Sequence, residues 1–265
     1  MHLRRPTALG AAALAGAAAL SLTLAVPSSA SAPAPSGYPD PAPRGPAHPS
    51  EPEVAGPDNI DRLDASVRRE SGTARGVSVT FDRHSRTASG EKPAAPRRFV
   101  FLFDKSLRLH PERFPVCTRD TIEKRGFDAC DPESVVGSGR ARTYGQDGAV
   151  EVKVFNTRYP NGNRGVLITV PETGAIFENT LERVSAPYRS TYRWALDERI
   201  EIPGTPAGER GASSRFTVSF GATRQAADGR THSYAETRAP RGEPLTLGLW
   251  SRFVTGQIVL PTARG

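Results

Sequence analysis

The chain contains almost no cysteine: Cys117 and Cys130 are the only two among 265 residues. Twelve residues lie between them, and no C-x-x-C or H-x-x-x-H spacing supplies metal ligands. A structural zinc ion needs four ligands and a redox-active pair usually has two residues between its sulfurs, so both interpretations are disfavoured. The remaining interpretation is a structural disulfide, which an oxidising compartment permits. Closing a loop of this length stabilises a fold by about 3 kcal/mol on the loop-entropy model.

Histidine is also scarce, and its five positions are scattered singly along the chain. Among them are His84, His110 and His232, and no G-x-S-x-G nucleophile elbow accompanies them. A Ser-His-Asp set is recognised by its geometry in space, so a secreted hydrolase built on one of these histidines stays open as an alternative. No motif indicates a catalytic residue, a cofactor or a metal, and we expect a non-catalytic protein.

Long apolar runs are missing after residue 26, so no later segment is expected to span a membrane. The single such run, Ala8 to Val26, comes after Arg4 and Arg5 and before Ser28 to Ala30, small residues typical of a cleavage site. This order predicts a secretory signal peptide over residues 1–30 rather than a membrane anchor. The general and the twin-arginine export routes both stay open. The mature protein is therefore expected to be secreted, outside the cytoplasmic membrane.

Lysine occurs at only four positions, so arginine supplies nearly all of the positive charge. Together with abundant alanine, glycine and proline, this bias indicates a GC-rich genome rather than selection for guanidinium chemistry. The formal net charge is +7, and it becomes +5 when Arg4 and Arg5 leave with the signal. Outside the cell, this excess would attract anionic cell-wall polymers or lipid headgroups. Nucleic acid is not expected as a partner, because acidic residues are interleaved and no aromatic-basic motif appears.

Proline is concentrated in residues 31–57, where it removes hydrogen-bond donors and fixes φ. Such a run is typical of an extended, disordered spacer rather than of a packed element. Residues 58–262 follow as a single β-rich domain, which is long enough to bury a core of its own.

Hydrophobic residues in this domain recur with the period of two that marks β-strands. The alternating segments are separated by Asp147-Gly148, Asn161-Gly162 and Asp228-Gly229, pairs that favour the positive φ of tight turns. Continuous apolar runs at 97–103 and 165–170 predict strands buried on both faces. The pattern predicts a mainly β fold, either an antiparallel β-sandwich or a curled, barrel-like sheet.

Helical signals are few. Residues 118–129 are predicted to form a short helix, with Thr118 as its N-cap and Gly126 at its C-terminal stop. This helix lies between the two cysteines, so we expect one short disulfide-closed helical loop. A turn or two of helix is also expected over residues 59–69.

Acidic residues cluster at Asp197, Glu198 and Glu201. Asp197 and Glu201 share one strand face and could form a carboxylate pair. The simpler interpretation is a solvated strand face whose acids pair with Arg193 and Arg199.

The region around the cysteines resembles a family of secreted proteins from high-GC Gram-positive bacteria (actinobacteria) whose function is uncharacterised. The shared core motif is F-P-x-C…C…S-x-V-G-x-G-x-A. The matching positions are Phe114, Pro115, Cys117, Cys130, Ser134, Val136, Gly137, Gly139 and Ala141. The resemblance implies export and supports the disulfide, and it supplies no activity.

Ser134, Gly137 and Gly139 of this motif are interpreted as structural. A nucleotide-binding loop would need a third glycine and a following helix, and both are missing here. Glycine within a strand more often marks a bulge or a close approach of another backbone.

These features favour a secreted, non-catalytic cell-envelope or extracellular protein that binds an anionic or carbohydrate wall component. A second hypothesis is a carrier of lipid or of a small hydrophobic ligand, with an apolar cavity enclosed by the sheet around residues such as Phe99, Phe101 and Phe103. A hollow interior would favour transport, and a filled interior would favour binding at the surface.

Overall fold

Residues 37–265 are described in the computed structural model of this chain, and they belong to one compact unit. The predicted signal peptide lies outside the described residues. Strand is the dominant structure, as the alternating sequence predicts. The strands are β1 (Ile60–Arg69), β2 (Gly76–Arg86), β3 (Pro96–Asp104), β4 (Leu107–Leu109), β5 (Val135–Thr143), β6 (Val150–Arg158), β7 (Arg164–Val170), β8 (Ala175–Arg183), β9 (Tyr192–Arg199), β10 (Ser213–Phe220), β11 (Thr223–Gln225), β12 (Thr231–Ser233), β13 (Ala235–Thr237), β14 (Thr246–Phe253), β15 (Ile258–Val259) and β16 (Thr262–Arg264). The helical segments are α1 (Arg119–Arg125) and the 3-10 turns η1 (Pro111–Arg113), η2 (Phe127–Ala129), η3 (Pro132–Ser134), η4 (Tyr188–Ser190) and η5 (Ala207–Glu209).

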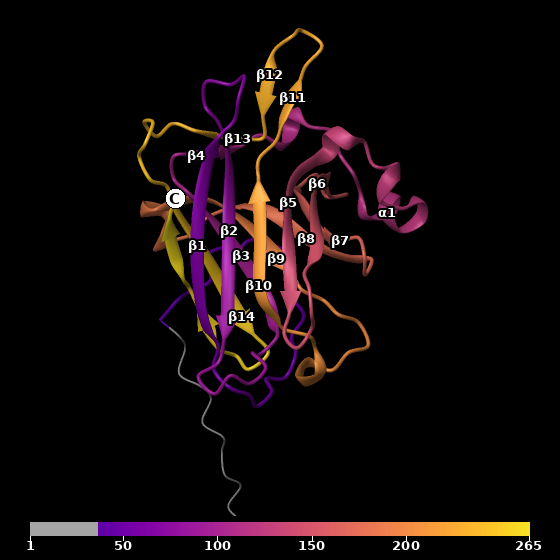
Figure 1. Ribbon diagram of the computed structural model, residues 1–265, viewed down its shortest axis with the longest axis vertical. Helices are drawn as coiled ribbons and strands as arrows, with labels where there is room; N and C mark the ends of the chain where they lie inside the picture. Colours follow the sequence, from indigo (N-terminus) through magenta and orange to yellow (C-terminus); the bar gives the residue numbers. More distant parts are fainter. Residues whose placement is uncertain (1–36) are drawn as a thin grey trace, which may run out of the picture. The chain divides into compact units, whose positions relative to one another are not determined.

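One large antiparallel sheet contains most of the strands, in the order β15-β14-β3-β9-β8-β7-β6-β5-β10-β2-β13-β4, with β1 beside β2 and β16 beside β14. The sheet curls, so that β1, β2, β10 and β5 form one layer and β3, β9 and β14 lie behind them (Figure 1). The backbone at Gly265, just after β16, lies against Ala65 and Ser66 of β1, which brings the two margins of the sheet together. This curled, sandwich-like sheet confirms the predicted fold class.

Phenylalanine rings from both layers fill the space between them. Phe81 of β2 contacts Phe101 and Phe103 of β3 with ring centroids 5.3 and 5.4 Å apart. Phe220 of β10 contacts the same two rings at 5.5 and 5.4 Å. All four side chains are fully buried, and their edge-to-face geometry is the one that aromatic pairs prefer. Burying each ring stabilises the fold by roughly 1.5–3 kcal/mol, so this cluster anchors the middle of the sheet.

The turns follow the sequence prediction. Gly148, Gly162 and Gly229 have φ values of 85°, 87° and 78°, and each lies between two antiparallel strands. Helix α1 also agrees with the sequence prediction at both of its ends. The Thr118 side chain accepts a hydrogen bond from the Thr121 backbone N–H at 3.1 Å, and the helix ends at Gly126 with φ 82°. Both end signals of the predicted helix are confirmed.

The predicted disulfide between Cys117 and Cys130 is confirmed, and it encloses α1. The closed loop covers the outer face of β6, β7 and β8. Its apolar side chains form one cluster with Phe155, Leu167 and Ile176. Because Val166 and Ile168 of β7 face the main core, this strand is buried on both faces, as its continuous apolar run predicts.

The prediction of a helical turn at residues 59–69 is wrong. Residues Ile60–Arg69 form β1, which pairs with β2 over its whole length. Leu63, Ala65 and Val67 pack on the core at alternate positions, which is the period of a strand. Pairing with a long neighbouring strand decides the conformation here over local helical preference.

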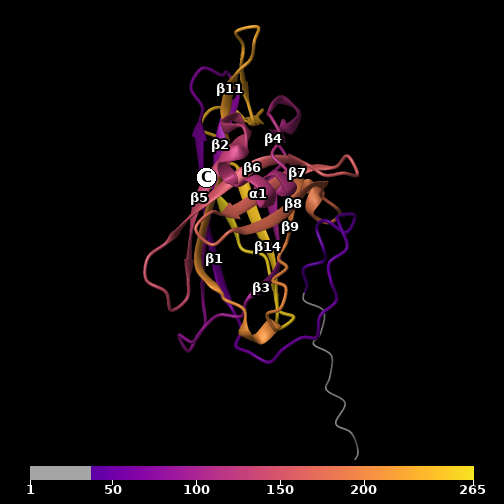
Figure 2. The ribbon, with the colours of Figure 1, turned by 90° about the vertical axis from the view of Figure 1, so that its right-hand side faces the viewer.

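The proline-rich segment departs furthest from the sequence prediction. A disordered spacer was expected over residues 31–57, but the structure packs Tyr38–Val54 on the outer face of β9, β3 and β14; we call these residues the arm. Figure 2 shows the arm as the indigo segment on the side of β9, β3 and β14 away from β1. Ala42 of the arm is 2% exposed and lies in one cluster with Val100, Leu102 and Trp250.

Hydrogen bonds explain why a proline-rich segment can pack without forming a strand. Proline has no N–H to give to a sheet, but the carbonyl groups of such a segment still accept hydrogen bonds. The Pro39 carbonyl accepts one from the Tyr188 hydroxyl at 2.9 Å, and the Tyr38 carbonyl accepts one from Trp250 Nε1 at 3.2 Å. The Ser185 backbone N–H also donates to the Pro41 carbonyl at 2.8 Å. Side chains below the arm thus satisfy its backbone.

Candidate functional site

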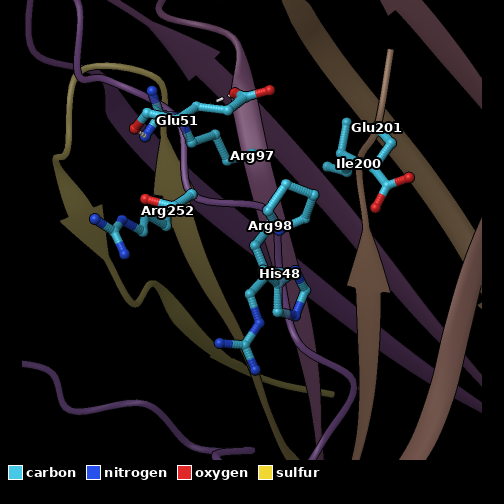
Figure 3. Close-up of a pocket in the computed structure, with 9 residues that line it drawn as sticks. His48, Glu51, Arg97, Arg98, Ile200, Glu201 and Arg252 are labelled. Carbon is cyan, nitrogen blue, oxygen red and sulfur yellow. Dashed lines mark hydrogen bonds and ion pairs between the residues drawn. The ribbon is translucent and has the colours of Figure 1, made fainter. Parts of the chain in front are cut away.

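A cleft of about 240 Å³ lies where the arm meets the domain (Figure 3). Arg97 and Arg98 of β3 and Arg252 of β14 line it, together with His48 and Glu51 of the arm. Three guanidinium groups in one cleft suggest a site for an anion. Whether the cleft can bind one depends on whether these groups are already paired with carboxylates.

Arg98 is fully engaged by carboxylates. Its Nε and Nη2 donate hydrogen bonds to both oxygens of Asp197 at 2.7 and 2.9 Å, and its Nη1 donates to Asp40 of the arm at 2.6 Å. Burial alone would lower the pKa of Arg98, but the hydrogen bonds and charges of Asp197 and Asp40 raise it above its usual value. His48 Nε2 also lies 3.3 Å from Asp197, whose side chain is completely buried. The solvated strand face predicted from sequence is therefore wrong for Asp197, which is buried and pairs with Arg98 rather than with Arg193 or Arg199.

The other basic residues at this cleft are paired in the same way. Arg97 Nε lies 3.6 Å from the Glu51 carboxylate, and Arg252 lies 3.3 Å from Glu53. Arg210, at the far side of Glu51, forms a bidentate pair with it at 2.6 and 2.9 Å. The hydrogen bond from Arg210 is the main reason that the pKa of Glu51 is lowered. Because acids neutralise each guanidinium, we interpret this cleft as the docking interface of the arm.

Glu198 faces the opposite way from Asp197, into the core. It lies two residues after the buried Leu196, is 3% exposed, and accepts a hydrogen bond from Asn179 Nδ2 at 3.2 Å. Burial raises the pKa of Glu198 to about 8, against the effect of the Asn179 hydrogen bond. The carboxyl group is therefore mostly protonated at neutral pH. The pairing with Arg199 expected from sequence is found instead at Glu201.

On a different surface, some arginines are paired with acids and others are not. We call the outer face of β1, β2, β10 and β5 the bare face, because its outward side chains are polar and no other segment lies over it in Figure 1. On β2, Val79, Phe81 and Arg83 point to the interior, while Asp82 and His84 point outward. The outward side chains continue across β10 and β5 in antiparallel register.

A cleft of about 480 Å³ lies on the bare face between β10 and β5. Its charged lining residues are Arg140, Arg142 and Arg215, and no acidic residue lines it. Arg215 forms a bidentate pair with Asp82 at 2.9 and 2.6 Å. Within residues 37–265, Arg140 and Arg142 have no carboxylate oxygen within 4.0 Å. Both side chains are exposed, so two guanidinium groups remain available to an anion from solvent.

Of the motif residues Ser134, Gly137 and Gly139, only Gly139 lines this cleft, and it contributes backbone rather than a side chain. Gly137 and Gly139 lie against the backbone carbonyls of Ser219 and Thr217, so that a side chain at either position would collide with β10. A β-bulge interrupts the β5 register between Val135 and Gly137. These are the structural roles inferred from the sequence. Ser134 is fully buried and its hydroxyl donates to the Asp131 carbonyl, which closes η3 before the strand begins.

The arginines of β5 were not identified from the sequence. A signal was present, because Arg140 and Arg142 are two residues apart in a strand and must share a face. Glu151 of β6 lies opposite Arg140 in register, so the lack of a carboxylate oxygen within 4.0 Å depends on how the side chains of the paired strands are placed, which the sequence does not specify.

Of the four histidines in residues 37–265, His48, His84 and His110 lie beside carboxylates, and His232 has no carboxylate oxygen within 4.0 Å. His84 Nε2 is 3.4 Å from Asp82, and the His110 ring nitrogens are 3.1 and 3.4 Å from Glu112 and Glu236. Residues 37–265 contain no group of three or more side chains that could hold a metal ion. Over the same residues, no helix is both long enough and apolar enough to cross a bilayer.

Comparison with known proteins gives no relative: no family model, curated protein or solved structure matches this chain.

Proposed function

We propose that this is a secreted, non-catalytic protein that binds an anionic polymer of the cell envelope through its bare face. The observation that carries the proposal is the cleft between β10 and β5, where Arg140 and Arg142 are exposed without acidic partners. Guanidinium groups bind phosphate and carboxylate oxygens through two parallel N–H donors, so an unpaired pair is suited to a polyanion.

The arrangement of charge favours a long ligand over a small one. In register across the sheet, Arg62, His84, Arg215 and Arg142 occupy successive strands. Neighbouring strands lie about 4.8 Å apart, so this row extends over roughly 14 Å. Lys153 of β6 lies opposite Ser138 of β5 and adds a further basic side chain beside the cleft. Arg62, His84 and Arg215 already lie beside Asp64 or Asp82. Within residues 37–265, an extended polymer on this face would therefore meet unpaired basic side chains at Arg140, Arg142 and Lys153.

Two further features support this proposal over the alternatives. The disulfide suits an oxidising, extracellular compartment, where a cell-wall polymer would be met. The phenylalanine cluster between the layers occupies the space that a carrier would need for its ligand, so we do not propose transport. No contact between a serine hydroxyl and a histidine ring occurs in residues 37–265 to favour a hydrolase.

Sedimentation with purified cell walls tests the proposal. The walls are used before and after chemical removal of their anionic polymers, over a series of rising salt concentrations. We expect retention at low salt, release as salt screens the charges, and no retention on stripped walls. The double variant R140A/R142A should bind about ten- to thirtyfold more weakly, if each basic group contributes about 1 kcal/mol at an anionic surface.

A matched control is R62A/R68A. These arginines are exposed on the same face but pair with Asp64 and Glu70 at 2.8 and 3.0 Å, so they should matter less. Equal retention of the wild-type protein and R140A/R142A would show that the cleft is not the binding site. Retention on stripped walls would show that the ligand is not the anionic polymer.

A further inference from the structure

A second cleft, in the other layer of the sheet, is more strongly basic than the bare face. We call it the β8–β9 cleft, because the end of β8, the connecting loop and the start of β9 form most of it. It has a volume of about 460 Å³ and is lined by Lys105, Arg183, Val184, Arg189, Tyr192 and Arg193. Four of these six residues are basic and none is acidic.

None of the four basic side chains has an acidic partner. Within residues 37–265, no carboxylate oxygen lies within 4.0 Å of the side-chain nitrogens of Lys105, Arg183, Arg189 or Arg193. The acid next to Lys105 is already occupied: Asp104 accepts hydrogen bonds from Ser106 and from the Thr246 backbone. This cleft therefore differs from the arm interface in Figure 3, where each guanidinium group meets a carboxylate.

Arg193 occupies an unusual position in the strand. Phe103 of β3 pairs with Trp194 of β9, while the next residue, Asp104, pairs with Tyr192. Arg193 is thus the extra residue of a β-bulge, a feature that redirects a side chain. Its Nε atom is buried and has no hydrogen-bond partner. A buried donor without a partner is destabilising. Within residues 37–265 the terminal nitrogens of Arg193 also form no hydrogen bond, so they remain available to a ligand in the cleft.

The neighbouring groups are held in place by contacts that leave their charged ends unpaired. The Arg183 guanidinium lies over the Trp194 ring, 3.8 Å from its centroid. Arg189 Nε donates to the Val184 carbonyl at 3.0 Å, which leaves both of its terminal nitrogens for another acceptor. The Lys105 backbone N–H donates to the Thr191 carbonyl at 2.9 Å and so ties the β3–β4 turn to this loop.

We propose that the β8–β9 cleft is a binding site for a compact, doubly charged oxyanion of the phosphate monoester class. Four positive charges around one small cleft match a ligand that concentrates negative charge on several oxygens. Arginine binds such oxygens in bidentate fashion, and lysine binds them as a point charge. This site is independent of the bare face, and the two ligands differ: a long polymer there, and a single charged group here.

Thermal unfolding in inorganic phosphate tests the site, with sodium chloride of equal ionic strength as the reference. A ligand that binds only the folded state raises the midpoint, and the effect saturates when the site is filled. We expect saturable stabilisation of the wild-type protein by phosphate. The variant Arg193→Gln should raise the dissociation constant for phosphate at least tenfold. In chloride alone it should be as stable as the wild type or more stable, because an unpartnered donor and a like charge are removed.

That combination separates a binding role from a structural one. A merely structural Arg193 would make Arg193→Gln less stable in chloride and leave the phosphate effect unchanged, and this result would overturn the proposal. If Arg193→Gln fails to fold, Lys105→Gln replaces it, since the Lys105 side chain makes no hydrogen bond in the fold. Arg158→Gln, an exposed arginine on β6, serves as the matched control and should keep the full response to phosphate.

Two further arms identify the source of the phosphate group. Glycerol phosphate represents a soluble monoester, and phosphatidylcholine vesicles with and without phosphatidic acid represent a lipid headgroup. Binding that depends on Arg193 in either arm supports the site, while failure of phosphate and of both arms refutes it. R140A/R142A should keep the phosphate response and lose retention on cell walls, so a failure of one proposal is distinguishable from a failure of the other.

Discussion

Replacing Arg98 with methionine tests how the arm is held. The guanidinium group of Arg98 joins three segments: it binds Asp197 of β9 through two hydrogen bonds, and Asp40 and the Ala42 carbonyl of the arm through two more. Arg98 is 8% exposed and Asp197 is 0% exposed, so both charges lie out of water. Methionine keeps most of the length of the side chain and removes only the charge and the donors.

The expected loss of folding stability in Arg98→Met comes from the Asp197 carboxylate, which stays buried without its main partner. Without Arg98, the His48 ring is the one side-chain hydrogen-bond partner that Asp197 keeps within residues 37–265. Removing one partner of a buried pair typically costs about 3–5 kcal/mol. For a domain of this size, 1 kcal/mol shifts the melting temperature by about 2–4 °C, so Arg98→Met should lower it by roughly 6–20 °C. The double variant R98M/D197L removes both charges, and an apolar replacement of a buried pair is often neutral. It should therefore recover most of the lost stability.

Urea unfolding measures both effects, and limited proteolysis before β1 reports on the arm separately. A loss below about 1 kcal/mol for Arg98→Met would mean that the buried pair contributes no more than a surface ion pair. If R98M/D197L is as unstable as Arg98→Met alone, the cost comes from lost packing against Trp250, over whose ring the guanidinium lies at 5.4 Å, rather than from the stranded charge.

Three other predictions concern the core, the disulfide and the glycine motif. Burial raises the pKa of Glu198 to about 8 from its ordinary value of 4.5. Between these two pH values the folded protein holds a proton that the unfolded chain has lost. The contribution of this raised pKa to the free energy of unfolding is fully present below about pH 4.5, and it falls by about 1.4 kcal/mol per pH unit as pH rises toward 8. In urea unfolding across that range, Glu198→Gln should remove this pH dependence. An unchanged pH dependence would show that the Glu198 carboxyl is not its source. Cys117→Ser should lower stability by about 3 kcal/mol and leave the fold recognisable by circular dichroism, and a thiol assay of the wild-type protein should find no free thiol. Gly139→Ala should cost about 1–3 kcal/mol because its methyl group would meet the Thr217 carbonyl. The control Gly211→Ala has ordinary contacts only and should stay within about 0.5 kcal/mol of wild type.

Local features of this fold were predictable because their causes are local. Each Asn-Gly or Asp-Gly turn needs positive φ at the glycine, and each has it. Thr118 and Gly126 bound α1 because a hydroxyl and a residue without a side chain suit the two ends of a helix. Residues 59–69 differ, because this short polar segment acquires its strand conformation by pairing with β2. Local sequence preference therefore predicted a helical turn there incorrectly.

The sequence also predicted that β3 is buried on both faces, and this is correct, but it did not identify the cover. Phe99, Phe101 and Phe103 face the core, and Val100 and Leu102 face outward beneath the arm. The run of apolar residues predicts only that some segment excludes water from the outer face, and it does not identify that segment. Proline content argued for a spacer, yet a segment poor in N–H donors can cover a sheet when donors below it bind its carbonyls.

The basic clefts could not be found from sequence, because what distinguishes them is the absence of a partner. Asp197 and Glu51 neutralise Arg98 and Arg210, which are about a hundred or more residues away in sequence. Within residues 37–265, Arg140 and Arg193 have no carboxylate oxygen within 4.0 Å. Arginine content therefore says little about binding, whereas the docking of distant segments decides which guanidinium groups stay free. The binding experiments need the full domain with its arm. A chain shortened to begin at β1 would lose Asp40, Glu51 and Glu53, and would expose Arg97, Arg98 and Arg252 to any polyanion. Only protein that keeps the arm can show whether the bare face or the β8–β9 cleft binds.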